Sequence, residues 1–262
     1  MRDSANDHSA LALNTASFSH NLDGRGAGWS TERVIDACSA QGFGGIVFWR
    51  REIGTRAIEI GDHVRGAGMQ VVGLCRTPFL VGVGTPKNLE GEIVASIEMA
   101  AALGAPVVTI VTGGTEPGTK GLGPTWDRFA DRLSHDCERA ASCGVKLGLE
   151  PLNTMFGGNR TCLFSVADAF ELCRGADAPN LGIAVDVYHV WWDSRLSRSL
   201  SDAGDLISGY HLCDWLADTS SMLLDRGMMG DGVVDLRDIR DAVENAGYRG
   251  LCEVEVFSSD DW

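Results

Sequence analysis

Four residues able to bind a metal ion or move a proton each close a short apolar run in the second half of the chain. They are Glu150 after VKLGL, Asp186 after NLGIAV, His211 in LISGYHLCD and Glu255 in GLCEVEV. Three carboxylates brought together would repel one another strongly unless a cation lay between them. Three oxygen ligands and one imidazole suit Mn²⁺, Mg²⁺ or Co²⁺ better than a structural zinc ion. The pattern predicts a site for one divalent metal ion, with Mn²⁺ as the first choice.

Each of these residues also has a simpler interpretation. Glu150 could be a solvated loop carboxylate, Asp186 could cap a following helix, and His211 could be a hydrogen-bonded core histidine. The last apolar run carries both Glu253 and Glu255 on one face, because side chains alternate along a strand. Glu255 is nearer the carboxyl end and is the preferred ligand, whereas Glu253 would orient a neighbouring side chain.

Other residues near these four have side chains suited to a polyhydroxy substrate. His189 lies in DVYHV, and Arg226 lies in the glycine-rich segment LLDRGMMGDG, where a guanidinium could hold a substrate oxygen or offset developing negative charge. Asn153 could bond a hydroxyl group, although asparagine is also common in loops. Trp191 and Trp192 could form an apolar wall against a sugar ring, or could simply pack in the core.

The elements that must position these residues alternate between short apolar runs and longer amphipathic runs. We expect strands at 11–14, 44–49, 69–75, 106–114, 145–150, 180–186, 206–214 and 250–256, and helices at 31–42, 55–68, 88–104, 124–144, 165–173 (capped by Ser165) and 236–247. Parallel neighbours need a crossover connection, and eight such units close into a barrel. The prediction is an α/β chain with a single (β/α)8 TIM-barrel domain over residues 1–262.

Two alternatives to a complete barrel remain open at this stage. An open doubly wound sheet usually shows a glycine fingerprint after its first strand, and NTASFSH (14–20) shows none. The sequence ends at Trp262, just past the eighth predicted strand. Either the barrel lacks an eighth helix, or that helix is missing from this sequence.

Composition narrows the range of partners. The formal net charge of −14 disfavours nucleic acid and membrane surfaces, and weakly disfavours strongly anionic substrates, although one local basic pocket could override that field. No stretch is apolar for long enough to cross a bilayer, and the polar amino terminus lacks the apolar region of a secretory signal. The eight cysteines form no CxxC motif, and we interpret them as reduced thiols of a cytoplasmic protein.

Five segments resemble the xylose-isomerase-like superfamily of TIM barrels, within the sugar phosphate isomerase/epimerase group that includes ketose 3-epimerases and inosose dehydratase. They are LGLEPLN (147–153), AVDVYHVWW (184–192), GYHLCDW (209–215), RGMMGDGVVDL (226–236) and GYRGLCEVEVF (247–257). The resemblance implies that the metal ligands are Glu150, Asp186, His211 and Glu255. It also implies that His189 and Arg226 bind substrate. Ketose epimerases carry another Glu six residues after the first ligand, and this chain has Phe156 there.

The resemblance further implies that Glu150 and Glu255 face opposite sides of the reacting carbon and act as an acid/base pair. A metal ion would lower the barrier to an enediolate by neutralising its charge. We therefore expect a metal-dependent isomerase or epimerase acting on a sugar or cyclitol. The alternative is a lyase on the same scaffold, either a dehydratase like inosose dehydratase or an enzyme that cleaves an oxidised glycoside.

Several finer expectations follow. No phosphate-cradling glycine loop is present, which favours a neutral or oxidised, unphosphorylated carbohydrate. The segments VFWRREIG (47–54) and CRTPF (75–79) carry no motif that points to a particular sugar. The resemblance makes a homodimer or homotetramer usual. An apurinic endonuclease, with three zinc ions and many histidines, fits poorly with six histidines in all. A catalytically inactive barrel is the remaining alternative and would carry no metal.

Overall fold

Eight parallel strands form a closed barrel in the computed structural model, which describes residues 7–18 and 26–258. The strands are paired in chain order, and the last pairs with the first, with Leu11 beside Cys252 and Leu13 beside Val254. They are β1 (Leu11–Asn14), β2 (Gly45–Trp49), β3 (Gln70–Cys75), β4 (Val107–Ile110), β5 (Lys146–Leu149), β6 (Leu181–Asp186), β7 (Ile207–Leu212) and β8 (Cys252–Val254). The predicted TIM-barrel fold is confirmed.

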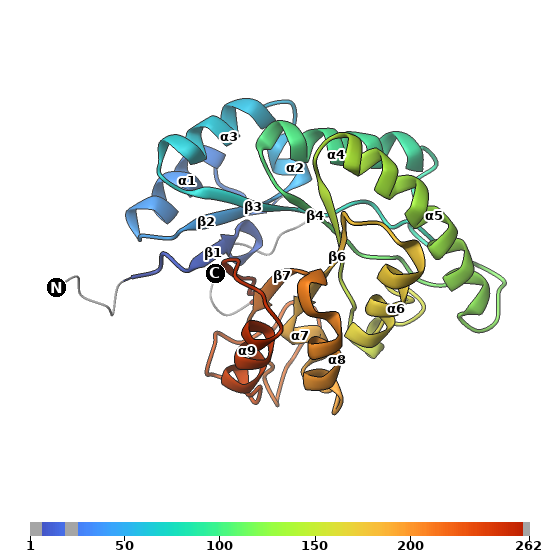
Figure 1. Ribbon diagram of the computed structural model, residues 1–262. Helices are drawn as coiled ribbons and strands as arrows, with labels where there is room; N and C mark the ends of the chain where they lie inside the picture. Colours follow the sequence, from blue (N-terminus) through green and yellow to red (C-terminus); the bar gives the residue numbers. More distant parts are fainter. Residues whose placement is uncertain (1–6, 19–25, 259–262) are drawn as a thin grey trace.

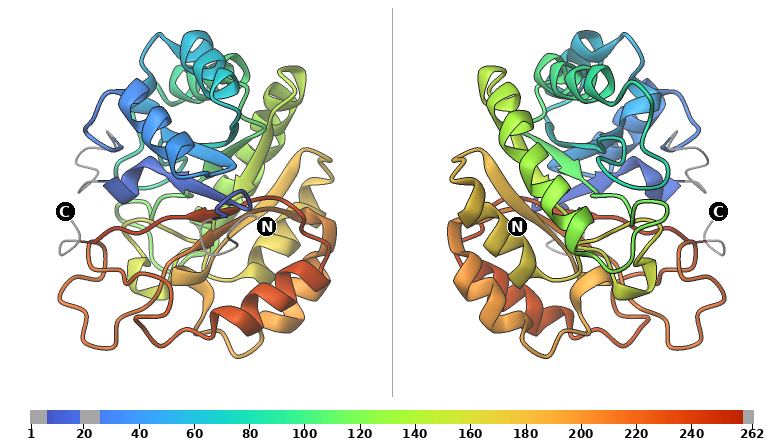
Figure 2. Two further views of the ribbon diagram at one scale, coloured as in Figure 1. Left: turned by 90° about the vertical axis from the view of Figure 1, so that its left-hand side faces the viewer. Right: turned by 90° about the vertical axis from the view of Figure 1, so that its right-hand side faces the viewer.

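Helices surround the strands, as Figure 1 shows. They are α1 (Thr31–Ala40), α2 (Arg50–Ile53), α3 (Ala57–Gly66), α4 (Leu89–Leu103), α5 (Gly123–Ser142), α6 (Val166–Ala176), α7 (Val187–Val190), α8 (Leu196–Ala203) and α9 (Leu236–Asn245). In the side views of Figure 2, the blue to green helices lie above the strands and the orange to red helices lie below them. Because all neighbouring strands are parallel, the connections that follow them lie at one end of the barrel, which we call its mouth.

Local sequence signals explain where several helices begin. The Ser30 side chain accepts a hydrogen bond from the backbone N–H of Arg33 at 3.3 Å, which starts α1. Ser165 does the same for Asp168 at 3.1 Å, as predicted for the start of α6. The longer α4 ends at Gly104, whose φ of 83° lies in the left-handed region that glycine adopts readily.

Small residues inside the barrel leave room for larger polar side chains. A Cβ atom added to Gly209 would lie 3.3 Å from Nε2 of His211, and one added to Gly182 would lie 2.8 Å from Cβ of Ser208. The large buried side chains, such as Phe48 and Phe129, belong to the core that includes the surrounding helices. The interior of the barrel can therefore hold charged groups near its mouth.

Three features differ from the sequence-based expectations. The predicted strand at 106–114 ends at Ile110, so the prediction is wrong for 111–114. The backbone there bonds to loops instead, with Thr112 accepting from Leu80 and Val81, and Gly113 donating to Arg160. The helices α2, α7 and α8 were not predicted. Within the described residues no helix follows β8, and both alternatives for an eighth helix stay open.

Two further observations concern the described part of the chain. All eight cysteines are free, and seven of them are buried, as expected for reduced thiols. None of the helices in residues 7–18 and 26–258 combines the length and the apolar character needed to cross a membrane.

Candidate metal centre and active site

Four ionisable side chains converge at the mouth of the barrel. Glu150 directly follows β5, Asp186 ends β6, His211 lies near the end of β7, and Glu255 directly follows the last strand. Each offers one ligand atom, and these atoms all lie within 4.8 Å of one another. All four side chains are buried. We call this group the metal cluster, because its donor set of three carboxylates and one imidazole fits a divalent ion.

The imidazole of His211 has two different sides. Its Nδ1 atom lies 3.0 Å from Oε1 of Glu150 and 3.9 Å from Oε2 of Glu255, yet it makes no well-oriented hydrogen bond. Its Nε2 atom lies 3.3 Å from Oε2 of Glu253. A proton on Nε2 donated to Glu253 would leave the Nδ1 lone pair directed at the carboxylates, which is the arrangement that a metal ligand needs.

Asp186 serves two purposes with its two oxygens. Oδ1 accepts a hydrogen bond from the backbone N–H of Tyr188 at 2.8 Å and so caps α7. Oδ2 lies 3.2 Å from Nη1 of Arg226 and 3.6 Å from Nε2 of His189. The capping interpretation of Asp186 and the ligand interpretation are therefore compatible, because each uses a different oxygen.

Arg226 is buried and held between two aromatic rings. Its guanidinium carbon lies 4.4 Å from the centre of the Tyr188 ring and 4.5 Å from that of Phe257. Nη1 contacts Oδ2 of Asp186 at 3.2 Å and Oε2 of Glu255 at 3.3 Å. Arg226 thus offsets part of the negative charge of the metal cluster.

Asn14, which the sequence analysis did not single out, connects the first strand to the last. Its Nδ2 atom donates to Oε1 of Glu253 at 2.6 Å and to Oε1 of Glu255 at 3.0 Å. Its Oδ1 atom accepts from Nε1 of Trp49 at 2.8 Å and from the backbone N–H of Ala16 at 3.0 Å. Because Oδ1 is engaged by two donors, the amide has one preferred orientation. The sequence signal that could have identified Asn14 is a polar residue at the end of an apolar run, as at the ends of the strands that carry the metal cluster.

A second group of potential ligands, Cys75, Glu253 and Glu255, lies beside the metal cluster. The Nδ2 atom of Asn14 sits among them, 3.6 Å from Sγ of Cys75 and within hydrogen-bonding distance of both carboxylates. An amide nitrogen therefore takes the place that a cation would need. Burial and the neighbouring carboxylates also raise the pKa of the Cys75 thiol well above its ordinary value, which keeps it a poor ligand.

In the absence of a metal ion, burial and the mutual repulsion of the carboxylates favour protonated forms of some groups in the metal cluster. Burial raises the pKa of Glu255 to about 8, against the opposing effect of Arg226. Burial disfavours a charge on His211, but Glu253 and Glu150 outweigh it and raise the pKa of the imidazole well above its ordinary value. Burial opposes ionisation of Asp186 as well, yet Arg226 and the two histidines lower its pKa. A dication would replace the protons of this cluster.

Among the predicted substrate-binding residues, His189 and Arg226 lie beside Asp186 of the metal cluster, and Asn153 contacts His189. Burial lowers the pKa of His189 to about 4, so its imidazole is neutral at pH 7. Its Nδ1 atom accepts from the backbone N–H of Asn153 at 3.3 Å. Its ring stands edge-on to the ring of Phe156, with 5.7 Å between the two ring centres. The side-chain oxygen of Asn153 accepts from the backbone N–H of Met155. The Trp191 ring lies 5.7 Å from that of Trp215, and its buried Nε1 atom has no hydrogen-bond partner.

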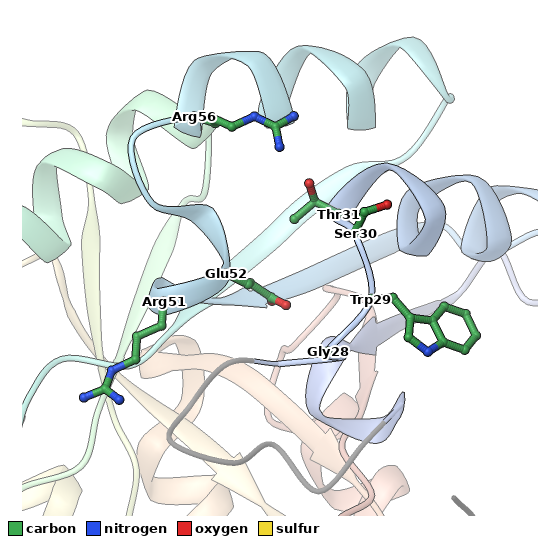
Figure 3. Close-up of a pocket in the computed structure, with 7 residues that line it drawn as sticks. All are labelled: Gly28, Trp29, Ser30, Thr31, Arg51, Glu52 and Arg56. Atoms are coloured by element: carbon green, nitrogen blue, oxygen red, sulfur yellow. The ribbon is translucent and has the colours of Figure 1, made fainter.

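A separate hollow of about 700 Å³ lies beside the amino-terminal end of α1, and none of the metal-cluster residues lines it. Figure 3 shows Glu52 pointing towards the Gly28 side of this hollow, while Arg51 turns away. The Glu52 carboxylate accepts hydrogen bonds from the Thr15 hydroxyl and from the backbone N–H groups of Trp49 and Ala27. Glu52 therefore ties the segments after β1 and β2 together.

Several known proteins are similar to this chain in sequence or in fold. The family model described as "Xylose isomerase-like TIM barrel" matches residues 35–262. A protein from Sinorhizobium meliloti 1021 with a solved crystal structure is 35% identical, with a TM-score of 0.87 over 97% of this chain and 91% of that one. Fructoselysine 3-epimerase from Escherichia coli O157:H7 is 30% identical over 134 residues.

The coverage of these matches differs. The aligned segment is 51% of this chain and only 46% of the fructoselysine 3-epimerase, so the match spans about half of that relative. The structure of D-psicose 3-epimerase from Clostridium cellulolyticum H10 superposes with a TM-score of 0.75 over 94% of this chain and 84% of that one. At 16% identity, the similarity to D-psicose 3-epimerase concerns the fold alone.

Proposed function

Because the chain belongs to the xylose isomerase-like TIM barrel family, we propose that it is a divalent-metal-dependent isomerase or epimerase of a sugar or cyclitol. The observation that carries the proposal is the convergence of Glu150, Asp186, His211 and Glu255 within 4.8 Å at the mouth of the barrel. The partial match to an enzyme named as a 3-epimerase supports epimerisation over other carbonyl chemistry.

The four residues of the metal cluster would hold one ion, with Mn²⁺ as the first choice and Mg²⁺ or Co²⁺ as alternatives. When bound, such an ion supplies Lewis acidity that stabilises negative charge on neighbouring substrate oxygens. Glu253 holds the imidazole of His211 by its Nε2 side, and Arg226 holds Asp186 and Glu255. These contacts keep the ligands in place before the substrate arrives, which reduces reorganisation during the reaction.

We assign the proton transfers to Glu150 and Glu255. Both oxygens of Glu255 already accept hydrogen bonds, Oε1 from Asn14 and Oε2 from Arg226. Among the described residues, Glu150 has only His211 within ion-pair distance, and its carboxylate is the less restrained of the two. Glu150 would remove the proton next to the carbonyl, and Glu255 would return one to the other face, which gives epimerisation or carbonyl migration.

His189, Arg226, Asn153 and Trp191 would bind the sugar. The neutral imidazole of His189 can donate from Nε2, because its Nδ1 atom accepts from the backbone of Asn153. The nearby ring of Phe156 occupies the place where ketose epimerases have a second Glu, which removes one hydrogen-bonding group for a substrate hydroxyl. We further propose a cytoplasmic location and a homodimer or homotetramer.

The decisive experiment is a proton-exchange assay. Protein reconstituted with Mn²⁺ is incubated in deuterated water with a panel of ketoses, inososes and 3-keto sugars, and the products are followed by NMR. Deuterium entering at a carbon next to the carbonyl is the expected result, and Glu150→Gln should abolish it. Asp136→Asn is the matched control and should retain exchange, because it changes a buried carboxylate that pairs with Arg132 on helix α5 and is not part of the metal cluster.

Mass separates the alternative function from the first. Isomerisation conserves the mass of the sugar, whereas a dehydratase product has lost water and a glycoside-cleaving lyase gives two fragments. Full exchange by metal-stripped protein, or by Glu150→Gln, would refute the proposed roles. An absence of exchange with every compound of the panel would count against the enzyme class itself.

A further inference from the structure

Two arginine side chains near the mouth of the barrel lack an acidic partner. Arg76 directly follows β3, and Arg160 lies in the connection between β5 and α6. Within residues 7–18 and 26–258, neither guanidinium has a carboxylate oxygen within 4.0 Å. The residue before Arg76 is Cys75, whose Sγ atom belongs to the group that contains Glu255. Arg76 is thus placed beside the candidate active site.

The guanidinium of Arg76 is half-buried against an aromatic ring. Its central carbon lies 4.3 Å from the centre of the Phe79 ring, and Nη1 donates to the backbone oxygen of Thr77 at 3.1 Å. Burial and, to a smaller extent, the positive charge of Arg160 lower its pKa to about 10, and the negative charge of Glu150 opposes the shift. Arg76 is therefore still a cation at pH 7.

Arg160 belongs to the same wall of the mouth. Its guanidinium lies 6.0 Å from the centre of the Phe156 ring, and its backbone oxygen accepts from Gly113 at 3.0 Å. Phe79 and Phe156 pack in one small apolar cluster with Val111 and Leu152. Phe156 also meets His189, which neighbours Asp186 of the metal cluster. The two guanidiniums therefore lie beside phenylalanine rings of one apolar cluster, and that cluster meets His189 at the edge of the metal cluster.

We propose that Arg76 and Arg160 form a subsite for an oxyanion carried by the substrate, so that the sugar is acidic and bears a carboxylate or a phosphate. Among the described residues, these two half-buried cations have no carboxylate oxygen within 4.0 Å, which is unfavourable, and a bound anion would remove that cost. A planar guanidinium also matches the paired oxygens of both groups. With a net charge of −14, the rest of the surface repels anions, so a local positive site is needed to admit them.

This inference rests on the proposed function, since it concerns the substrate of that reaction, but binding alone tests it. The probes are D-fructose, D-fructuronate and D-fructose 6-phosphate, which differ only in carrying an alcohol, a carboxylate or a phosphate at the last carbon. Their dissociation constants for Mn²⁺-loaded protein are measured by calorimetry at low salt. We expect at least one anionic probe to bind about ten-fold more tightly than fructose. Tighter binding of fructuronate would identify the anion as a carboxylate, and tighter binding of fructose 6-phosphate would identify it as a phosphate.

Substitutions locate the effect. Arg76→Gln and Arg160→Gln should each reduce the preference for the anionic probe by about ten-fold and leave fructose binding unchanged. Arg76→Lys keeps the charge and should retain part of the preference, which separates charge loss from misfolding. Arg174→Gln is the matched control, because Arg174 also lies over a phenylalanine ring, at 5.7 Å from Phe170, but on helix α6.

Three results would overturn the subsite. They are equal affinity of the wild-type protein for the three probes, an absence of measurable binding by both anions, and equal loss of all three affinities in Arg76→Gln. Each can occur while deuterium exchange with neutral sugars proceeds normally, so the subsite can fail while the proposed function stands. Conversely, a preference for an anionic probe in a protein that shows no deuterium exchange would support the subsite and count against the proposed function.

Discussion

The side-chain amide of Asn14, at the end of β1, donates a hydrogen bond of 3.0 Å to Oε1 of Glu255, 241 residues later in the chain. The same nitrogen donates to Glu253, and the opposite end of the amide is held by Trp49. One neutral side chain thus sets the positions of two buried carboxylates. Asn14 bonds to Oε1 of Glu255, whereas Arg226 bonds to Oε2.

Replacing this amide should impair both folding stability and metal binding. Asn14→Ala removes two hydrogen bonds to buried carboxylates, and we expect it to lower the free energy of unfolding by about 2–4 kcal/mol and the Mn²⁺ affinity by about 10–100-fold. Chemical denaturation and calorimetric metal titration measure the two effects. Asn180→Ala is the control, because that amide bonds only to the backbone oxygens of Cys137 and Val145. Unchanged metal affinity in Asn14→Ala would contradict this role.

Glu253 should fix the tautomer of His211. In Glu253→Gln, the new amide cannot accept from both Asn14 and His211, so one of these contacts becomes a donor–donor clash. We expect Mn²⁺ affinity to fall by about ten-fold. In protein loaded with diamagnetic Mg²⁺, the ¹⁵N chemical shifts of the His211 ring should show a single proton, on Nε2, in the wild type and a mixture of tautomers in the variant. A wild-type ring protonated only on Nδ1 would be incompatible with the proposed ligand arrangement.

Metal binding should strengthen as the pH rises from 6 to 8. The pKa of Glu255 is raised to about 8, so this group is largely protonated below pH 8 in the metal-free protein, and the raised pKa of His211 makes the imidazole hold its second proton to a higher pH than an ordinary histidine. A metal ion must displace these protons, and each one displaced makes the affinity rise by up to about ten-fold per pH unit. Calorimetry in buffers of different ionisation enthalpy counts the protons released. An affinity that is flat over this range would show that the cluster is already ionised.

Glu52 should make stability depend on pH independently of the metal cluster. Burial raises its pKa from 4.5 to about 7, although hydrogen bonds from Thr15, Trp49 and Ala27 oppose the shift. Because the folded-state pKa is the higher one, the stabilisation is complete below pH 4.5 and is lost as the pH rises through 7. The free energy of unfolding of Glu52→Gln, relative to wild type, should therefore rise by roughly 1–3 kcal/mol between these limits. Denaturation at a series of pH values tests this, and parallel curves for the two proteins would exclude it.

Much of the fold was readable from the sequence because two simple signals coincide in it. Apolar runs of strand length recur between amphipathic segments, and the observed strands fall within the predicted ranges. Helix α8 was not predicted because it is short and has few apolar positions that could reveal a helical pattern. Its buried residues are Leu196, Ser199, Leu200 and Ala203. Helix α7 is a single turn whose start depends on Asp186, a residue already assigned to the site.

The candidate site was only partly readable. Residues that close apolar runs, such as Glu150 and Asp186, stand out because an ionisable group there is unusual in a strand. The contact of Asn14 with Glu255 depends on barrel closure, and the position of Arg76 and Arg160 beside two phenylalanines of one apolar cluster depends on loop packing. No local pattern encodes distances between segments so far apart in the chain, and these relationships therefore emerge only in three dimensions.

The pairing of β8 with β1 also has a consequence for biosynthesis. While a ribosome is still adding the residues after Val254, the first strand has no permanent neighbour on one side, and the Asn14 amide has no carboxylates to meet. The edge of β1 therefore stays unpaired until Cys252–Val254 have been made, and an unpaired strand edge can associate with other chains. Closing the barrel brings together residues that lie 241 positions apart, such as Asn14 and Glu255, and contacts of such long range form slowly.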